Sequence, residues 1–322
     1  MKNQVYGKVL AVVVLLSLLL GGCGKGDKSG NGEKLSGTLT ISGAWALYPM
    51  VVQWGEEFRK VYPDVQFDIS AGGAGKGMAD ALGGAADIGM VSREVKQEEI
   101  DQGAFWVTVV ADAVVPTLNA NNPYLAQLQA RGFTAEDFEA IWMGRVKTWG
   151  DVLGDASITD EIHVYTRSDA CGAADTWALY LGGHKQEDLQ GVAVYGDPGL
   201  AEAVAKDPLG IGYNNLNFAY DMNTGKPITN LAIAPIDVNG NKTVDDNENY
   251  YADKRGVMQA IAEGRYPSPP ARGLNLVTKG KPTGLALAFI RWTLTDGQAF
   301  AEPTGYIPLT EAQVKIELAK LD

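Results

Sequence analysis

Residues 166–177, TRSDACGAADTW, carry side chains that can hold a small anion immediately before a predicted helix. Arg167 supplies a positive charge and a fork of hydrogen-bond donors, and together with Asp169 it could form either a ligand clamp or a structural ion pair. The first backbone N–H groups of a helix have no partner within it, and the helix dipole favours negative charge at that end. The segment therefore indicates a loop that holds an anion at a helix N-terminus.

Two other turns have the same position between a strand and a helix. Residues 44–47 lie between a strand that begins at residue 39 and a helix predicted over 49–62, and residues 74–77 follow a strand over 65–70. The three turns can aim free N–H groups at one point, where a dehydrated anion needs many donors. This alternation predicts an α/β fold. Thr134, with Asp137 three residues later, predicts a further helix start.

Cys171, in the third turn, has more than one interpretation. A lone cysteine is most often a small, buried apolar side chain. At a helix N-terminus its pKa can instead be lowered, and the thiol then prefers soft oxyanions or metals. A catalytic thiol paired with His163 or His184 is a third interpretation, but no residue pattern that would orient such a base is visible. The sequence therefore predicts a binding protein and not an enzyme.

The first 22 residues predict an export signal. Lys2 and Lys8 supply its positive start, residues 9–20 are apolar, and Leu-Gly-Gly-Cys ends at Cys23. This pattern predicts lipid attachment at Cys23 and a flexible tether over 23–37. The formal net charge is −12, and it becomes −14 without residues 1–22, which carry two lysines and no acid. Such a charge disfavours nucleic acid, so we expect an exported protein anchored by lipid in the cell envelope.

The ordered set of motifs resembles the phosphate-binding protein family of bacterial ABC importers. The matching segments are ISGAWALYP, SAGGAGKGMADALGGAADIGMVSRE, FEAIWMGRVKTWGDV, TRSDACGAADTW, GDPGLAEAVAKDPLGIGYNN, EGRYPSPPARGLNLVTKGKPTG and TGYIPL. The resemblance implies a two-lobed periplasmic-binding-protein fold of type II, in which each lobe is a mixed sheet flanked by helices and two hinge strands join the lobes. It places lobe 1 at 38–115 and 268–322, and lobe 2 at 116–267.

The same resemblance implies a function. A monomer of this family closes around a small oxyanion of the phosphate type and delivers it to an ABC permease, without a required cofactor. The implied ligand-binding residues lie in the three turns and in the MVSRE segment: Ala44, Trp45, Ala46, Leu47, Ala74, Gly75, Ser92, Arg167, Asp169, Cys171, Gly172 and Ala173.

The chain departs from this family in the hydroxyl groups that face the ligand. Relatives usually carry Ser or Thr at several of the turn positions. Each hydrogen bond to a charged group contributes roughly 1.5–3 kcal/mol, so losing several weakens the binding of a dianion. The alternative function is a sensor or accessory binding lipoprotein for a soft oxyanion or an organic ligand, which Trp45 could cover. The departures are Ala44, Trp45, Ala46, Ala74, Lys76, Cys171 and Ala173.

Residues 237–248, DVNGNKTVDDNE, match the spacing of a twelve-residue calcium loop. The match departs at the sixth position, where Lys242 stands in place of glycine. A solvated acidic surface loop is the other interpretation, and an ion here would be structural. The predicted ligands are Asp237, Asn239, Asn241, the carbonyl of Thr243, Asp245 and Glu248.

Overall fold

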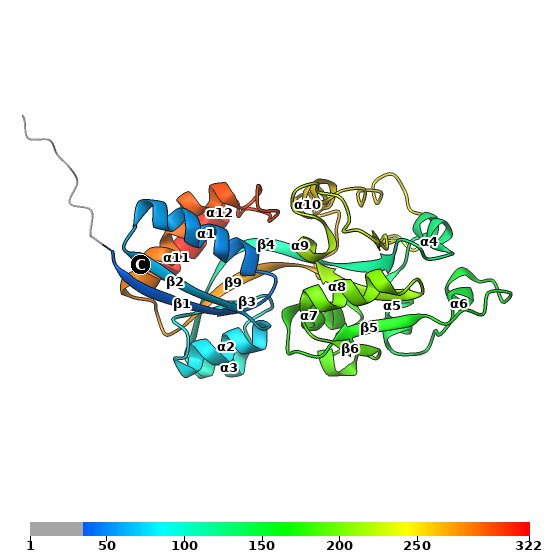
Figure 1. Ribbon diagram of the computed structural model, residues 1–322, viewed down its shortest axis with the longest axis horizontal. Helices are drawn as coiled ribbons and strands as arrows, with labels where there is room; N and C mark the ends of the chain where they lie inside the picture. The colour runs from blue at the N-terminus through cyan, green and yellow to red at the C-terminus, as the bar shows by residue number, and fades with distance from the viewer. Residues whose placement is uncertain (1–34) are drawn as a thin grey trace, which may run out of the picture. The chain divides into compact units, whose positions relative to one another are not determined.

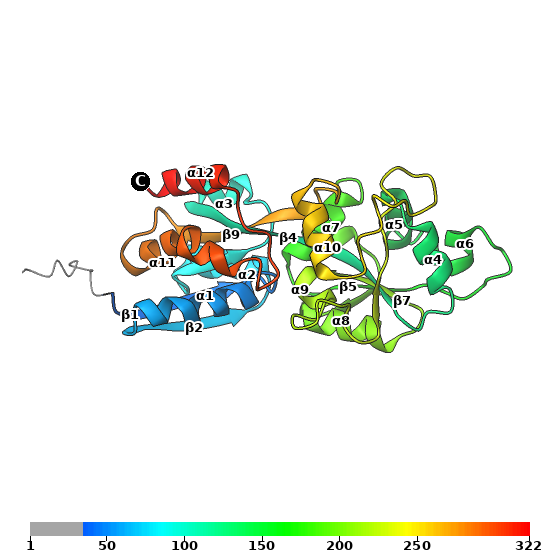
Figure 2. The ribbon, with the colours of Figure 1, turned by 90° about the horizontal axis from the view of Figure 1, so that it is seen from above.

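The computed structural model describes residues 35–322, in which strands and helices alternate along the chain (Figures 1 and 2). The predicted export signal, Cys23 and most of the predicted tether fall on residues 1–34, outside the described residues. The first strand, β1 (Gly37–Gly43), already includes the last residue of the predicted tether. In the described part of the chain, no helix combines the length and the apolar character needed to cross a membrane.

Buried apolar side chains form two large clusters. The first cluster draws on residues 39–110 and 274–321, and the second on residues 113–271. The strands β4 (Ala104–Asn119) and β9 (Ala271–Lys279) run from one cluster to the other (Figure 1). Each cluster is the core of one lobe, because helices on a sheet must bury their apolar faces locally. We call these parts lobe 1 and lobe 2; the boundaries given above stay a prediction.

Lobe 1 is built around a helix that the residue spacing predicts. In α1 (Tyr48–Val61), Pro49 occupies the first turn, and Met50, Trp54 and Phe58 form a fully buried face. The aromatic side chains of α11 (Gly284–Leu294) pack on this face, with Phe58 and Phe289 in edge contact at 5.3 Å between ring centroids. The other elements of the lobe are β2 (Val65–Ala71), α2 (Ala74–Gly83), β3 (Ile88–Val91), α3 (Gln97–Asp101), α11 (Gly284–Leu294) and α12 (Glu311–Leu321).

Two helices of lobe 2, α5 (Ala135–Trp142) and α6 (Trp149–Leu153), begin at threonines whose side chains cap them. Thr134 accepts the N–H of Asp137, and the Asp137 carboxylate accepts the N–H of Thr134, so the predicted helix start is confirmed. The elements of this lobe are α4 (Leu125–Arg131), α5 (Ala135–Trp142), α6 (Trp149–Leu153), β5 (His163–Arg167), α7 (Gly172–Tyr180), β6 (Val192–Val194), α8 (Gly196–Lys206), β7 (Gly210–Asn215), α9 (Leu216–Ala219), β8 (Leu231–Ile233) and α10 (Lys254–Ala262).

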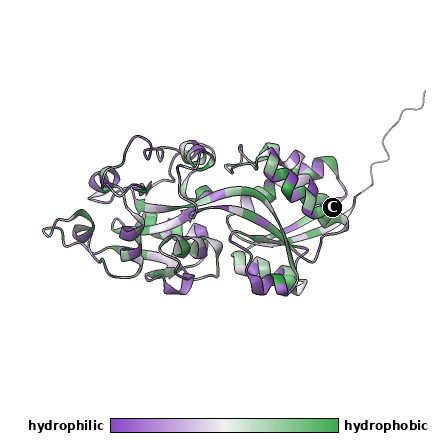
Figure 3. Cartoon of the chain, turned by 180° about the vertical axis from the view of Figure 1, so that it is seen from behind, coloured by the Kyte–Doolittle hydropathy of each residue, from purple (hydrophilic) through white to green (hydrophobic). Residues whose placement is uncertain are grey.

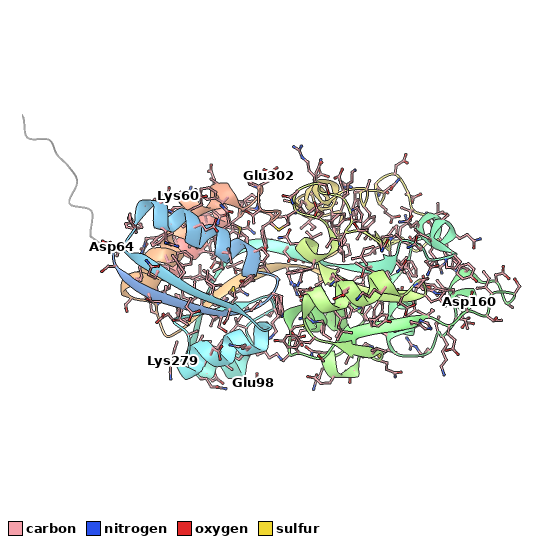
Figure 4. All side chains as sticks on the ribbon, in the orientation of Figure 1. Lys60, Asp64, Glu98, Asp160, Lys279 and Glu302 are labelled. Atoms are coloured by element: carbon pink, nitrogen blue, oxygen red, sulfur yellow. The ribbon has the colours of Figure 1, made fainter. Side chains whose placement is uncertain are left out.

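The strands of both lobes join in one sheet of mixed direction. Its order is β2-β1-β3-β9-β4-β7-β5-β6, with β8 paired to β4. Some pairs are parallel, as in β1 with β2 and β5 with β7, whereas β4 pairs antiparallel with β7, β8 and β9, and β3 pairs antiparallel with β9. The surrounding helices carry both hydrophobic and hydrophilic residues (Figure 3). Charged side chains such as Lys60 and Asp160 lie on the periphery (Figure 4). The predicted two-lobed α/β fold of mixed sheets is confirmed.

Candidate ligand-binding site

The three turns meet where the two lobes face each other. In the first turn of α2, Gly75 donates its N–H to the carbonyl of Ala170 in the third turn, at 3.0 Å. A Cβ placed on Gly172 would lie 2.2 Å from the carbonyl oxygen of Ser92, so only glycine allows this approach. The first turn reaches the same boundary through the ring of Trp45, which lies against the start of α8. The folding of both lobes thus brings the predicted turns together.

Arg167 lies at the centre of a buried ion cluster at this boundary. Its side chain, at the end of β5, is 1% exposed. Nε and Nη2 donate to the two carboxylate oxygens of Asp169 at 2.8 and 2.6 Å, and Nη1 donates to Asp197 at 2.6 Å. Burial opposes the guanidinium charge, but the carboxylates of Asp197 and Asp169 raise the pKa of Arg167 above its ordinary value. Arg167 is therefore a fixed, fully charged group.

Asp197 lies outside the residues predicted from the sequence. It stands in the first turn of α8, is buried, and accepts the backbone N–H and the side-chain amide of Asn215 at 3.1 and 2.8 Å. Gly196, directly before it, has a φ of 73° and donates its N–H to Asp169 at 3.1 Å. The sequence GDPG at residues 196–199 could have indicated this site. Glycine accepts the positive φ of a turn, and an aspartate in the first turn of a helix is stabilised by the helix dipole.

Several backbone N–H groups that the sequence predicts to be free have partners within the protein. Ala44 donates to the carbonyl of Met90 at 2.9 Å, Leu47 donates to that of Ala44 at 3.1 Å, and Gly75 donates to the third turn. The side chains of Ala44, Ala46 and Leu47 belong to the core of lobe 1. The prediction of free donors is thus wrong for these three N–H groups, because nearby carbonyls satisfy them.

The second turn contributes less charge to the boundary than its lysine indicates. Lys76 forms an ion pair with Asp80, one helical turn along α2, and donates to the hydroxyl of Ser42 at 2.7 Å. The hydrogen bonds that Lys76 and the Ser42 hydroxyl donate to the Asp80 carboxylate lower the pKa of Asp80 below its ordinary value. Lys76 is thereby held within lobe 1, whereas the guanidinium groups of Arg167 and Arg272 lie at the third turn, where Arg272 donates to the carbonyl of Gly172.

Cys171 is a buried cap of α7. Its side chain is 3% exposed, its sulfur accepts the N–H of Ala174 at 3.4 Å, and its own N–H donates to Gln186 at 3.0 Å. Burial raises the pKa of the thiol to about 12, although Arg167 acts in the opposite direction. The interpretation as a low-pKa thiol is therefore wrong, because loss of solvation outweighs the helix terminus. The two histidines pair elsewhere, His163 with Asp207 and His184 with Glu139.

We expect Cys171 to resist alkylation in the folded protein. A pKa near 12 reduces the thiolate fraction at pH 8 by about a thousandfold relative to a free cysteine. Iodoacetamide labelling at pH 8, followed by peptide mass spectrometry to separate Cys171 from Cys23, should show labelling of Cys171 only after unfolding in urea. Rapid labelling of Cys171 in the native protein would contradict this assignment.

A cavity of about 1070 Å³ opens between the lobes next to the turns. Its lining combines residues 93–96 and Glu98 of lobe 1, α7 of lobe 2 and both long strands, and it includes none of the predicted ligand-binding residues. Arg93 bridges the lobes at its edge, with Nε 3.1 Å from Asp175 on α7 and Nη2 2.7 Å from Glu99. The ion pair of Arg93 with Asp175 is a direct link between the lobes.

The predicted calcium loop is closed by its own hydrogen bonds. Asp237 accepts the N–H groups of Gly240 and Lys242 at 2.8 and 2.7 Å, and Glu248 accepts that of Val238 at 2.9 Å. Lys242 adopts a φ of 63°, the conformation for which glycine is preferred at this position. Within residues 35–322, no group of three or more His, Cys, Asp or Glu side chains gathers in a way that could hold a metal ion. Calcium binding stays a prediction.

The chain is similar to proteins of known family over most of its length. A family model described as a PBP superfamily domain matches residues 29–297. Over 316 residues the chain is 28% identical to the phosphate-binding protein PstS of Bacillus subtilis (strain 168). The alignment covers 95% of this chain and 94% of that protein. The chain is 25% identical over 379 residues to the phosphate-binding protein PstS of Methanocaldococcus jannaschii, covering 98% and 96%.

Solved structures agree in fold. A candidate phosphate ABC transporter substrate-binding protein from Clostridium perfringens, crystallised with bound phosphate, superposes with a TM-score of 0.68 at 22% identity, covering 85% of this chain and all of that one. An ABC-type phosphate transport receptor from Vibrio cholerae gives 0.59 at 17% identity, covering 84% of this chain and all of that one. With the match of the family model over most of its length, the chain belongs to the PBP superfamily, as a PstS-like member.

Proposed function

We propose that this protein is an extracytoplasmic solute-binding lipoprotein that captures a small oxyanion of the phosphate type for an ABC importer. One observation carries the proposal: a fully buried arginine, Arg167, stands where turns from both lobes meet. Relatives named phosphate-binding proteins match the chain over nearly its whole length. Ligand release would follow from separation of the lobes about β4 and β9. We assign no catalytic role, since the thiol of Cys171 is buried and protonated.

The charges around Arg167 favour an anion that carries its own protons. The guanidinium of Arg167 faces two carboxylates, those of Asp169 and Asp197, so an anion that binds at Arg167 also meets carboxylate oxygens. An anion with an O–H group can donate to a carboxylate, whereas an anion without one only meets its repulsion. Phosphate carries an O–H group at neutral pH and sulfate does not. We therefore expect phosphate to be preferred over sulfate.

The remaining parts of the proposal come from the sequence. Lipid attachment at Cys23 would hold a monomer at the membrane surface, where a permease can receive the ligand. The alternative of a sensor for a soft ligand loses its chemical support, because burial raises the pKa of Cys171. Ligand contacts by Ser92, Gly172 and Ala173 are part of the proposal, since Ser92 and Gly172 already touch across the boundary.

Calorimetry and thermal shift on the full-length protein in detergent test this function. Phosphate at a hundred times its Kd should stabilise the folded state by about 2.7 kcal/mol and raise the melting temperature. Arsenate, which also carries an O–H group, should act like phosphate, and sulfate should have little effect. Equal shifts with sulfate and phosphate would contradict the preference, and no shift with phosphate in large excess would contradict the function.

A further inference from the structure

Trp45 is the side chain of the first turn that crosses from lobe 1 to lobe 2. Its ring lies 6.4 Å, between centroids, from Tyr195 and from Phe218 in lobe 2, in edge-on geometry. A Cβ placed on Gly196 would lie 3.3 Å from two atoms of the indole, so the ring rests on the bare backbone at the start of α8. The start of α1 faces α8 and α9 in the same region of Figure 2. Trp45 thus joins the two lobes with an aromatic contact.

The indole N–H of Trp45 is buried and has no acceptor in the described residues. It is on the edge of the ring that faces Gly196, with Nε1 3.4 Å from the position that a Cβ on Gly196 would take. Gly196 in turn donates to Asp169, which holds Arg167. An unsatisfied buried donor is costly, and a polar group in this position is normally paired with protein, water or ligand.

The surroundings of this donor distinguish it from other tryptophans. Within residues 35–322, Trp149, Trp177 and Trp292 also have buried N–H groups without an acceptor, but all three lie inside the apolar cores of the lobes. Trp54 finds the carbonyl of Gly297 at 2.8 Å. Trp45 is only half-buried and ends beside the ion cluster of Arg167. Its N–H is therefore an unpaired donor at the place where an anion is proposed to bind.

We propose that Trp45 is a ligand-binding residue of this protein that donates its indole N–H to the bound oxyanion. This inference rests on the proposed function. The neutral donor replaces a hydroxyl that the first turn lacks, since Ala44 and Ala46 have none. It adds no further charge to a cluster that already holds two carboxylates and one guanidinium. The same ring packs against Tyr195 and Phe218 of lobe 2. One side chain therefore provides both the hydrogen-bond donor and a contact between the lobes.

Phenylalanine at this position keeps a flat aromatic ring and removes the donor. In the full-length protein, Trp45→Phe should weaken phosphate binding roughly 10- to 100-fold by calorimetry, the effect of losing one hydrogen bond to a charged group. Trp292→Phe is the matched control, because it removes an unpaired indole N–H from the core of lobe 1, away from the boundary. It should leave the Kd within about threefold of wild type, since it touches no ligand contact.

Nuclear magnetic resonance measures the signal of the Trp45 indole N–H proton directly. The chain has seven tryptophans, and the indole signal absent from Trp45→Phe is that of Trp45. On saturation with phosphate this proton should move downfield, as expected when it gains a charged acceptor. Binding by wild type with an unmoved Trp45 signal and an unchanged Kd in Trp45→Phe would overturn the inference and leave the proposed function intact. No phosphate binding by wild type would overturn both.

Discussion

Arg167→Met should lower the free energy of unfolding by about 3–5 kcal/mol, because it leaves two buried carboxylates without a partner. Asp169 and Asp197 are both buried, and each accepts a hydrogen bond of 2.6 Å from the guanidinium. Urea unfolding at pH 7 measures the loss. The control is Arg291→Met, which breaks the exposed pair with Asp322 and should cost less than about 1 kcal/mol.

A triple variant separates the structural role of Arg167 from its role in binding. In Arg167→Met with Asp169→Asn and Asp197→Asn, no charge is left unpaired, and most of the lost stability should return. Phosphate binding should remain absent in both the single and the triple variant, because both lack the guanidinium. Restored stability together with restored phosphate binding would show that the anion is held elsewhere. A small loss in the single variant would show that the carboxylates are hydrated.

Much of this site could be predicted from local residue patterns. The strand-to-helix turns, the capping pair Thr134 and Asp137, and the arginine of the third turn each depend on residues within a few positions of one another. Such patterns predict the structure well because capping and turn residues determine the local backbone conformation through contacts with their neighbours in the sequence. Arg167 therefore lies at the predicted turn, together with Asp169.

The parts that could not be predicted depend on contacts between distant segments. The N–H of Ala44 is satisfied by Met90 of β3, and Cys171 loses its exposure through packing of the lobe 2 core, so neither result is visible in the turn itself. Asp197 joins Arg167 across 30 residues of chain. A pKa depends on this three-dimensional burial, which explains why the thiol differs from its sequence-based prediction.

The buried Asp112 should make the protein less stable as the pH rises from 4 to 8. Asp112 on β4 faces Arg272 on β9 where the long strands pass between the lobes, and its Oδ1 is buried without a hydrogen-bond partner in the described residues. Burial raises its pKa to about 7, and the charge of Asp197 acts in the same direction, while Arg272 opposes them. Arg272 itself is engaged by Thr176 at 2.9 Å and by Asn215.

The direction of this pH dependence follows from the number of protons bound by Asp112 in the folded and in the unfolded protein. Between about pH 4 and pH 7 the folded protein keeps a proton on Asp112 that the unfolded chain has released, so stability falls as pH rises. A pKa of about 7 in place of the ordinary value near 3.9 corresponds to roughly 4 kcal/mol. This contribution is fully present below pH 4 and lost as the pH passes 7.

Asp112→Asn should remove this dependence, because the amide has no proton to release in this range. Relative to wild type, the variant should gain roughly 4 kcal/mol of stability between pH 4 and pH 8, as measured by urea unfolding at each pH. Asp68→Asn, on the exposed face of β2, should follow wild type throughout. A constant difference between Asp112→Asn and wild type at every pH would mean that Asp112 is ionised in the folded protein, with Arg272 as its effective counter-charge. The expected pH profile instead makes Asp112 a neutral acid at the hinge below pH 7, where its lost charge also reduces repulsion toward an anion bound near Asp197.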